Sequence, residues 1–285
     1  MTSHPRTIFL TAFRTVFRNT CLIGLLVAGQ TAVLSADEPK ADSEVLLRCD
    51  FESDDWWRTW GERESPKRVD LVANSSQFGF EPFDGRALRI RIDQGGHYGL
   101  SLAYRFSKQL GWEPEAVRFS YRIRLGDDWD PKHGGKLPGI AATYNRAGWG
   151  GRRVDGTDGW SARGLFVKRQ DGKTPIGFYC YHADMKGRYG SHWQWADDGF
   201  EGLENNRWYE VEQFVRLNTP GKNDGVLRGW VDNRLVFEKT DVRFRDVDSL
   251  KIETVWVNVY YGGTAPSKTQ QHLFLDDLII SGAER

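Results

Sequence analysis

The sequence predicts an all-β fold, namely a β-jelly-roll sandwich of two antiparallel sheets with a concave groove. Apolar and polar side chains alternate in many short segments, most clearly in VRFSYRIRL at residues 117–125. No segment carries an apolar stripe of helical period over three turns. Many alternating strands in one chain are typical of a sandwich or a jelly roll.

The expected strands follow from this alternation, in chain order. Asp232 and Asn233 lie between two of them as a two-residue connection, which predicts a hairpin. The first strand and the last are expected to pair and close the domain. Strands are expected at residues 45–51, 87–92, 98–106, 117–125, 164–168, 175–182, 209–217, 227–231, 235–239, 251–261 and 272–281, with part of 139–144 as a further strand. The glycine-rich residues 145–159 are expected to form a binding loop.

The amino-terminal segment has the pattern of a secretory signal. Arg6, Arg14 and Arg18 precede a short apolar run, and Ala36 precedes a polar stretch. We therefore expect a signal peptide at residues 1–36, a linker at 37–43 and a single jelly-roll domain at 44–285. The protein is expected to be secreted or periplasmic, with no membrane segment after signal removal. An uncleaved anchor is the alternative.

Charge is balanced overall but not locally. The chain has 39 lysines and arginines and 39 aspartates and glutamates. Residues 131–190 hold eleven of the cations and four of the anions, a net charge of +7. Such a local field attracts an anionic ligand, whereas scattered charges on a solvated surface are the alternative. The 12 tryptophans either fill the core or, in part, stack on sugar rings.

Cysteine and metal patterns are sparse. Cys49 and Cys180 either form one disulfide or remain two buried thiols. No catalytic zinc motif is present, so no cofactor is expected to be required and no metal is assigned to the active site. Asp50, Glu52 and Asp276 are candidate ligands for a structural calcium ion where the terminal strands meet.

Five polar residues stand out as candidates for one site. Lys136 lies in GGKLPG at residues 134–139, which lacks the Ser or Thr that follows the lysine of a phosphate loop. Ser161 and Arg163 are spaced i, i+2, as are Tyr179 and Tyr181, so each pair shares one face of a strand. Around Lys136, these side chains would grip an acidic sugar and move a proton from it. A surface lysine in a turn is the alternative for Lys136.

The lysine motif and the two pairs together resemble polysaccharide lyase family 14 and its relatives. The resemblance covers roughly residues 115–281, including VNVYYGG at 257–263. It implies a secreted or viral β-jelly-roll enzyme that cleaves alginate or glucuronan. It also implies that Lys136, Ser161, Arg163, Tyr179 and Tyr181 line the active cleft.

A uronate polymer is cleaved by β-elimination, in which a proton leaves C5 and the bond to the oxygen at C4 breaks. Arg163 is expected to bind the carboxylate, with Ser161 adding a hydrogen bond. Lys136 acts either as an ammonium or, if burial or Arg163 lowers its pKa from about 10.4, as the base. Tyr179 or Tyr181 protonates the leaving oxygen, or one of these phenols is the base. We favour Lys136 as base and Tyr181 as acid.

Two other functions remain open from the residues. A non-catalytic carbohydrate-binding jelly roll would hold an acidic glycan and release no unsaturated product. A glycoside hydrolase on the same fold needs paired carboxylates, and the alternating acidic motif E-x-D-x-E is absent. In each case we expect an acidic polysaccharide partner, no nucleic acid and a monomer.

Overall fold

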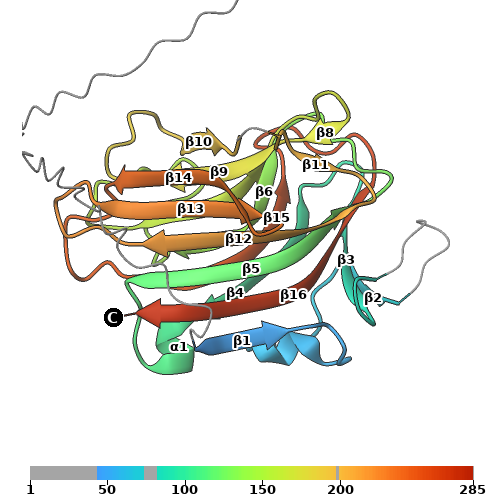
Figure 1. The fold of residues 1–285 in the computed structure, drawn as a ribbon, viewed down its shortest axis with the longest axis horizontal. Coiled ribbons are helices and arrows are strands. Elements are labelled where there is room, and N and C mark those ends of the chain that lie inside the picture. The colour runs from blue at the N-terminus through green and yellow to red at the C-terminus, as the bar shows by residue number, and fades with distance from the viewer. Residues whose placement is uncertain (1–43, 74–81, 197–198, 285) are drawn as a thin grey trace, which may run out of the picture. The chain divides into compact units, whose positions relative to one another are not determined.

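The computed structural model describes residues 44–73, 82–196 and 199–284. Two antiparallel sheets dominate this part of the chain, which confirms the all-β sandwich (Figure 1). The predicted signal peptide, 1–36, and linker, 37–43, lie outside the described residues, so these boundaries stay predictions. Within the described part, no helix has both the length and the apolar character needed to cross a membrane.

The larger sheet has eight strands. Its order is β14-β13-β12-β5-β16-β3-β2, and β1 pairs with β16. The pairing of β1 with β16 confirms that the first and last strands meet. The bounds are β1 Val45–Cys49, β2 Val69–Val72, β3 Ala87–Ile92, β5 Ala116–Leu125, β12 Trp208–Arg216, β13 Gly225–Val231, β14 Arg234–Val242 and β16 Gln271–Glu284.

The smaller sheet has six strands in the order β10-β9-β7-β6-β15-β4. Its strands are β4 Tyr98–Arg105, β6 Gly135–Ala142, β7 Trp160–Phe166, β9 Ile176–Tyr181, β10 Ser191–Gln194 and β15 Thr254–Tyr261. A two-stranded ribbon pairs β8 Lys173–Thr174 with β11 Leu203–Glu204, and the short helices are η1 Trp56–Trp60 and α1 Phe106–Leu110.

The main core lies between the two large sheets. Alternation in β5 buries Val117, Phe119 and Tyr121 among the apolar residues that β15 and β9 contribute from the other sheet. The intervening positions of β5 are polar, and Arg122 pairs with Glu210 of β12 at 3.3 Å. The period-two pattern therefore sets which face of each strand is buried.

The two-residue turn between β13 and β14 confirms the predicted hairpin. Asp232 and Asn233 both have positive φ, 50° and 63°, as the predicted hairpin between β13 and β14 requires.

Cys49 and Cys180 are buried and free. Since Cys49 belongs to the eight-stranded sheet and Cys180 to the six-stranded sheet, the interpretation as two thiols holds.

Strand β6 is longer than the sequence suggested. Lys136 lies within it, so the interpretation of this lysine as a turn residue is wrong. Leu137 and Ile140 both reach the core although they are three positions apart, because the register shifts between them. The β-bulge at Pro138 and Gly139 resembles a turn in sequence but preserves the strand.

Gly139 allows β6 to approach β7 closely. A Cβ at Gly139 would lie 2.5 Å from Arg163 Cα and 2.6 Å from the Ala162 carbonyl oxygen, both backbone atoms. Gly139→Ala is therefore expected to lower the free energy of unfolding by about 1–3 kcal/mol, measured by chemical denaturation. Gly263→Ala is the matched control, because a Cβ there meets nothing within 4 Å. Equal stability of the two variants would contradict this close-contact argument.

The acidic residues at the terminal strands form no evident metal site. Asp276 is 2% exposed, and its Oδ2 is buried without a hydrogen-bond partner. Burial, followed by the nearby Asp277, Glu52 and Asp50, raises the pKa of Asp276 to about 7. Among the described residues, no group of three or more His, Cys, Asp or Glu side chains is placed to hold a metal ion. Structural calcium stays a prediction.

Candidate active site

The five predicted residues all lie on the six-stranded sheet, on β6, β7 and β9. Strand register places Arg163 opposite Tyr179, and Ser161 opposite Tyr181. Each i, i+2 pair therefore shares one face of its strand, as the sequence predicted. Lys136 enters this group from β6, where its side chain reaches the ring of Tyr179.

Lys136 is the central cation. Its Nζ lies 3.5 Å from the centroid of the Tyr179 ring. Burial, and secondarily the charge of Arg163, lowers the pKa of Lys136 to about 7. Near neutral pH a substantial fraction of this lysine is a neutral amine that can accept a proton.

Arg163 is the second cation, and it is 7% exposed. Its Nη1 donates to Asn258 Oδ1 at 3.2 Å, and its Nε is buried without a hydrogen-bond partner. The guanidinium carbon lies 4.7 Å from the centroid of the Trp256 ring. Burial lowers the pKa of Arg163 to about 10, so the group remains charged at neutral pH.

The two phenols differ in access. Tyr179 is 7% exposed and its hydroxyl oxygen accepts a hydrogen bond from the Gly190 N–H at 3.2 Å. Tyr181 is 0% exposed and accepts from the Gly151 N–H at 3.0 Å. Burial, and secondarily a hydrogen bond with Tyr181, raises the pKa of Tyr179 well above its usual value. Tyr179 therefore keeps its proton at neutral pH.

Ser161 is fully buried, and its hydroxyl donates to the Gly148 carbonyl oxygen at 2.7 Å. Together with the bond between Tyr181 and Gly151, this contact attaches the loop 143–159 to the sheet. The single hydroxyl proton of Ser161 is therefore used in the hydrogen bond to the loop and is not free for a second acceptor. Its predicted contact with substrate stays a prediction.

Three further residues join the group that the sequence analysis did not select. His192 on β10 pairs in register with Tyr179, and their ring centroids are 5.0 Å apart. Asn258 holds Arg163, and Tyr260 on β15 pairs in register with Lys136. The alternation in VNVYYGG could have indicated Asn258 and Tyr260, since both fall on one face. His192 lay outside every predicted strand.

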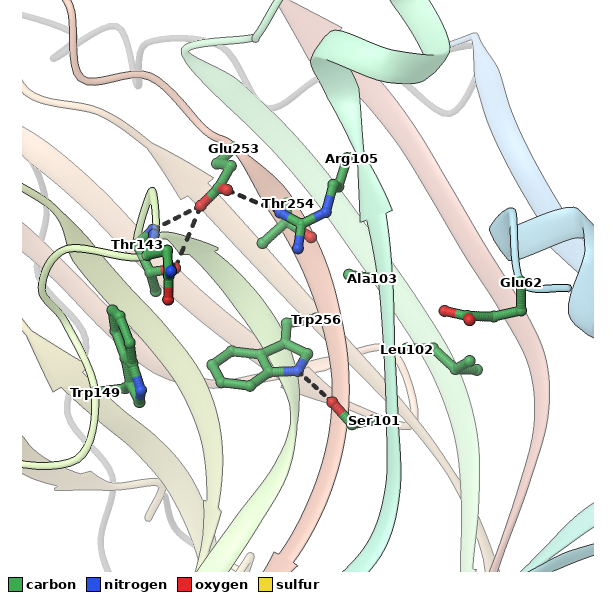
Figure 2. Close-up of a pocket in the computed structure, with 11 residues that line it drawn as sticks. Glu62, Ser101, Leu102, Ala103, Arg105, Thr143, Trp149, Glu253, Thr254 and Trp256 are labelled. Atoms are coloured by element: carbon green, nitrogen blue, oxygen red, sulfur yellow. Dashed lines mark hydrogen bonds and ion pairs between the residues drawn. The ribbon is translucent and has the colours of Figure 1, made fainter. Parts of the chain in front are cut away.

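The charge of this site is not balanced internally. Within the described part of the chain, neither Lys136 nor Arg163 has a carboxylate within ion-pair distance. A cavity of about 510 Å³ lies next to Arg163, lined by residues that include Trp149 and Trp256 (Figure 2). A half-buried lysine and a buried arginine without counterions, next to an open cavity, suit an anionic ligand.

Solved structures of polysaccharide-cleaving enzymes share this fold. The alginate lyase Aly36B matches with a TM-score of 0.64 at 17% identity, over 84% of this chain and 94% of the other. The PL-14 alginate lyase from Aplysia kurodai gives 0.61 at 17% identity, over 84% and 99%. The endo-β-1,4-glucuronan lyase from the fungus Trichoderma reesei gives 0.55 at 14% identity, over 84% and 96%. The fold is therefore that of a β-sandwich polysaccharide lyase.

The sequence match is more specific. Residues 91–277 match the family described as polysaccharide lyase 14. The chain therefore belongs to polysaccharide lyase family 14, which confirms the resemblance proposed from its motifs. No curated protein matches the chain. Aly36B has also been solved with alginate tetrasaccharide, in a double variant in which a lysine and a tyrosine are replaced by alanine.

Proposed function

We propose that this enzyme is a secreted lyase that cleaves a uronate polymer, either alginate or glucuronan, by β-elimination. The observation that carries the proposal is the adjacency of Lys136, with a pKa of about 7, to the unpaired cation Arg163. Arg163 supplies the charge that a carboxylate needs, and Lys136 supplies an amine that is able to take a proton. The basic and apolar pattern of residues 1–36 supports export.

Arg163 binds the carboxylate next to C5 in the proposed mechanism. A bound carboxylate is neutralised by the guanidinium, and this makes the C5–H bond more acidic. Asn258 holds Nη1 of Arg163 and so orients the guanidinium. We assign Asn258 a positioning role, and Ser161 the role of holding the loop 143–159.

Lys136 and Tyr179 move the protons. The neutral amine of Lys136 takes the C5 proton, the electron pair of that bond forms the C4–C5 double bond, and the bond from C4 to the glycosidic oxygen breaks. The phenol of Tyr179 protonates the leaving oxygen, and proton exchange with solvent restores both groups. Tyr179 takes this role in place of Tyr181, because Tyr181 exposes no surface to a substrate.

A polymer panel tests the proposal. Purified enzyme is incubated with alginate, glucuronan and a neutral glucan, and the ultraviolet absorbance of the new conjugated double bond is followed. We expect absorbance to rise with one of the two uronate polymers and not with the glucan. Binding without an absorbance change would favour a carbohydrate-binding module, and new reducing ends without a double bond would favour a hydrolase.

The pH dependence follows from Lys136. The base must be neutral, so kcat/KM on the cleaved polymer is expected to rise about tenfold per pH unit below about 7 and then level off. Because the pKa of Tyr179 is raised, this phenol loses its proton only above the pH range in which a tyrosine usually titrates. The alkaline loss of activity is therefore expected above that range. A profile measured across this range with an acid limb near pH 4 would instead indicate a carboxylate base.

A further inference from the structure

The cavity next to Arg163 has the size of a ligand site but contains none of the proton-transferring groups. Its volume of about 510 Å³ lies in the range usual for small-molecule sites. Trp149 of the loop 143–159 and Trp256 of β15 line it from two different elements (Figure 2). Because Trp256 also packs on Arg163, the cavity continues the active site toward β4.

Both indoles are held in place. The Trp256 Nε1–H donates to Ser101 Oγ at 3.0 Å, and the Arg152 guanidinium carbon lies 4.5 Å from the Trp149 ring centroid. Both rings remain partly exposed. Two fixed, partly exposed aromatic faces on either side of a cavity offer apolar surface to a flat, hydroxylated ring.

Charged side chains also line the cavity. Arg105 donates through Nη1 to Glu253 Oε1 at 2.9 Å, while 45% of its side chain stays exposed. Glu253 Oε2 also accepts hydrogen bonds from the backbone N–H groups of Thr143 and Tyr144, both at 2.8 Å. Arg105 can therefore also bind a carboxylate, and the exposed Glu62, which also lines the cavity, can accept hydrogen bonds from hydroxyl groups.

We propose that this cavity is a subsite for one hexuronate unit of the polymer, distinct from the unit whose C5 proton is removed. The pyranose ring lies between Trp149 and Trp256, and its carboxylate binds Arg105. The acidic nature of the ligand rests on the proposed function. The consequence is that oligosaccharides long enough to reach the cavity bind more tightly than short ones.

The experiment measures binding and cleavage separately. Hexasaccharides of alginate and of glucuronan are titrated calorimetrically into Lys136→Met, which lacks the proposed base, and into the same protein with Trp149→Ala or Trp149→Phe added. Cleavage is followed by ultraviolet absorbance in the proteins that keep Lys136. For the hexasaccharide that binds, we expect Trp149→Ala to raise Kd about tenfold and Trp149→Phe to stay within about threefold of the Lys136→Met parent. Disaccharide binding is expected to be the same in all three proteins.

A second variant tests whether the effect of Trp149→Ala comes from the cavity or from a disturbed loop 143–159. Ala103→Phe fills the cavity from β4 without changing the loop, and it is expected to weaken hexasaccharide binding similarly. Equal hexasaccharide Kd values for the folded Trp149 and Ala103 variants and their Lys136→Met parent would overturn the subsite, as would the failure of both hexasaccharides to bind that parent. Binding that depends on Trp149, without unsaturated product, would overturn the lyase function while supporting the subsite.

Discussion

Lys136→Met is expected to lower kcat on the cleaved polymer by about a thousandfold, because it removes the group that takes the C5 proton. Methionine has a similar length and no charge, so it preserves the contact with the Tyr179 ring. The thermal unfolding temperature is expected to stay equal or to rise, since a partly buried cation is removed. The measurement combines ultraviolet absorbance at saturating polymer with a thermal melt.

Two control variants make this result specific. Lys132→Met changes a lysine four residues away that pairs with Asp130 on the surface, and it is expected to leave kcat unchanged. Lys136→Arg keeps the positive charge but cannot become neutral near pH 7, so it is expected to lose as much activity as the methionine variant. If Lys136→Arg remained active, Lys136 would act as a charge stabiliser and the proposed base would be wrong.

The fold followed from the sequence where a strand has one face on the core. Alternation gave the bounds of β3 without error and those of β5 within one residue. It missed β2 and β10, which are four residues long and have few buried positions. A short strand with few buried residues leaves little periodic signal, so its existence depends on the neighbouring strand.

The site was predicted in composition but not in its detailed contacts. The spacing of Arg163 and Tyr179 within their pairs indicated shared faces, but the register that places them opposite each other depends on strand pairing. The sequence could not show that Ser161 would bond to a loop carbonyl thirteen residues earlier. It also gave no measure of access, which is what separates Tyr179 from Tyr181.

Tyr179→Phe is expected to lower kcat by a factor of about one hundred to ten thousand, because only the proton donor is removed and the ring under Lys136 remains. Tyr181→Phe is expected to lower kcat by about tenfold or less. The Tyr181 hydroxyl accepts a hydrogen bond from the Gly151 N–H. Its removal therefore loosens the loop 143–159 and leaves the proposed acid in place. Initial rates at saturating polymer compare the two variants, with Tyr189→Phe, at an exposed tyrosine, as control.

The comparison of the two variants decides the acid assignment because both substitutions delete one hydroxyl and retain one ring. Access to substrate favours Tyr179, which is partly exposed, over Tyr181, which is not. A larger loss in Tyr181→Phe than in Tyr179→Phe would return the acid role to Tyr181. It would also require the loop 143–159 to open during catalysis, since Gly151 now covers that hydroxyl.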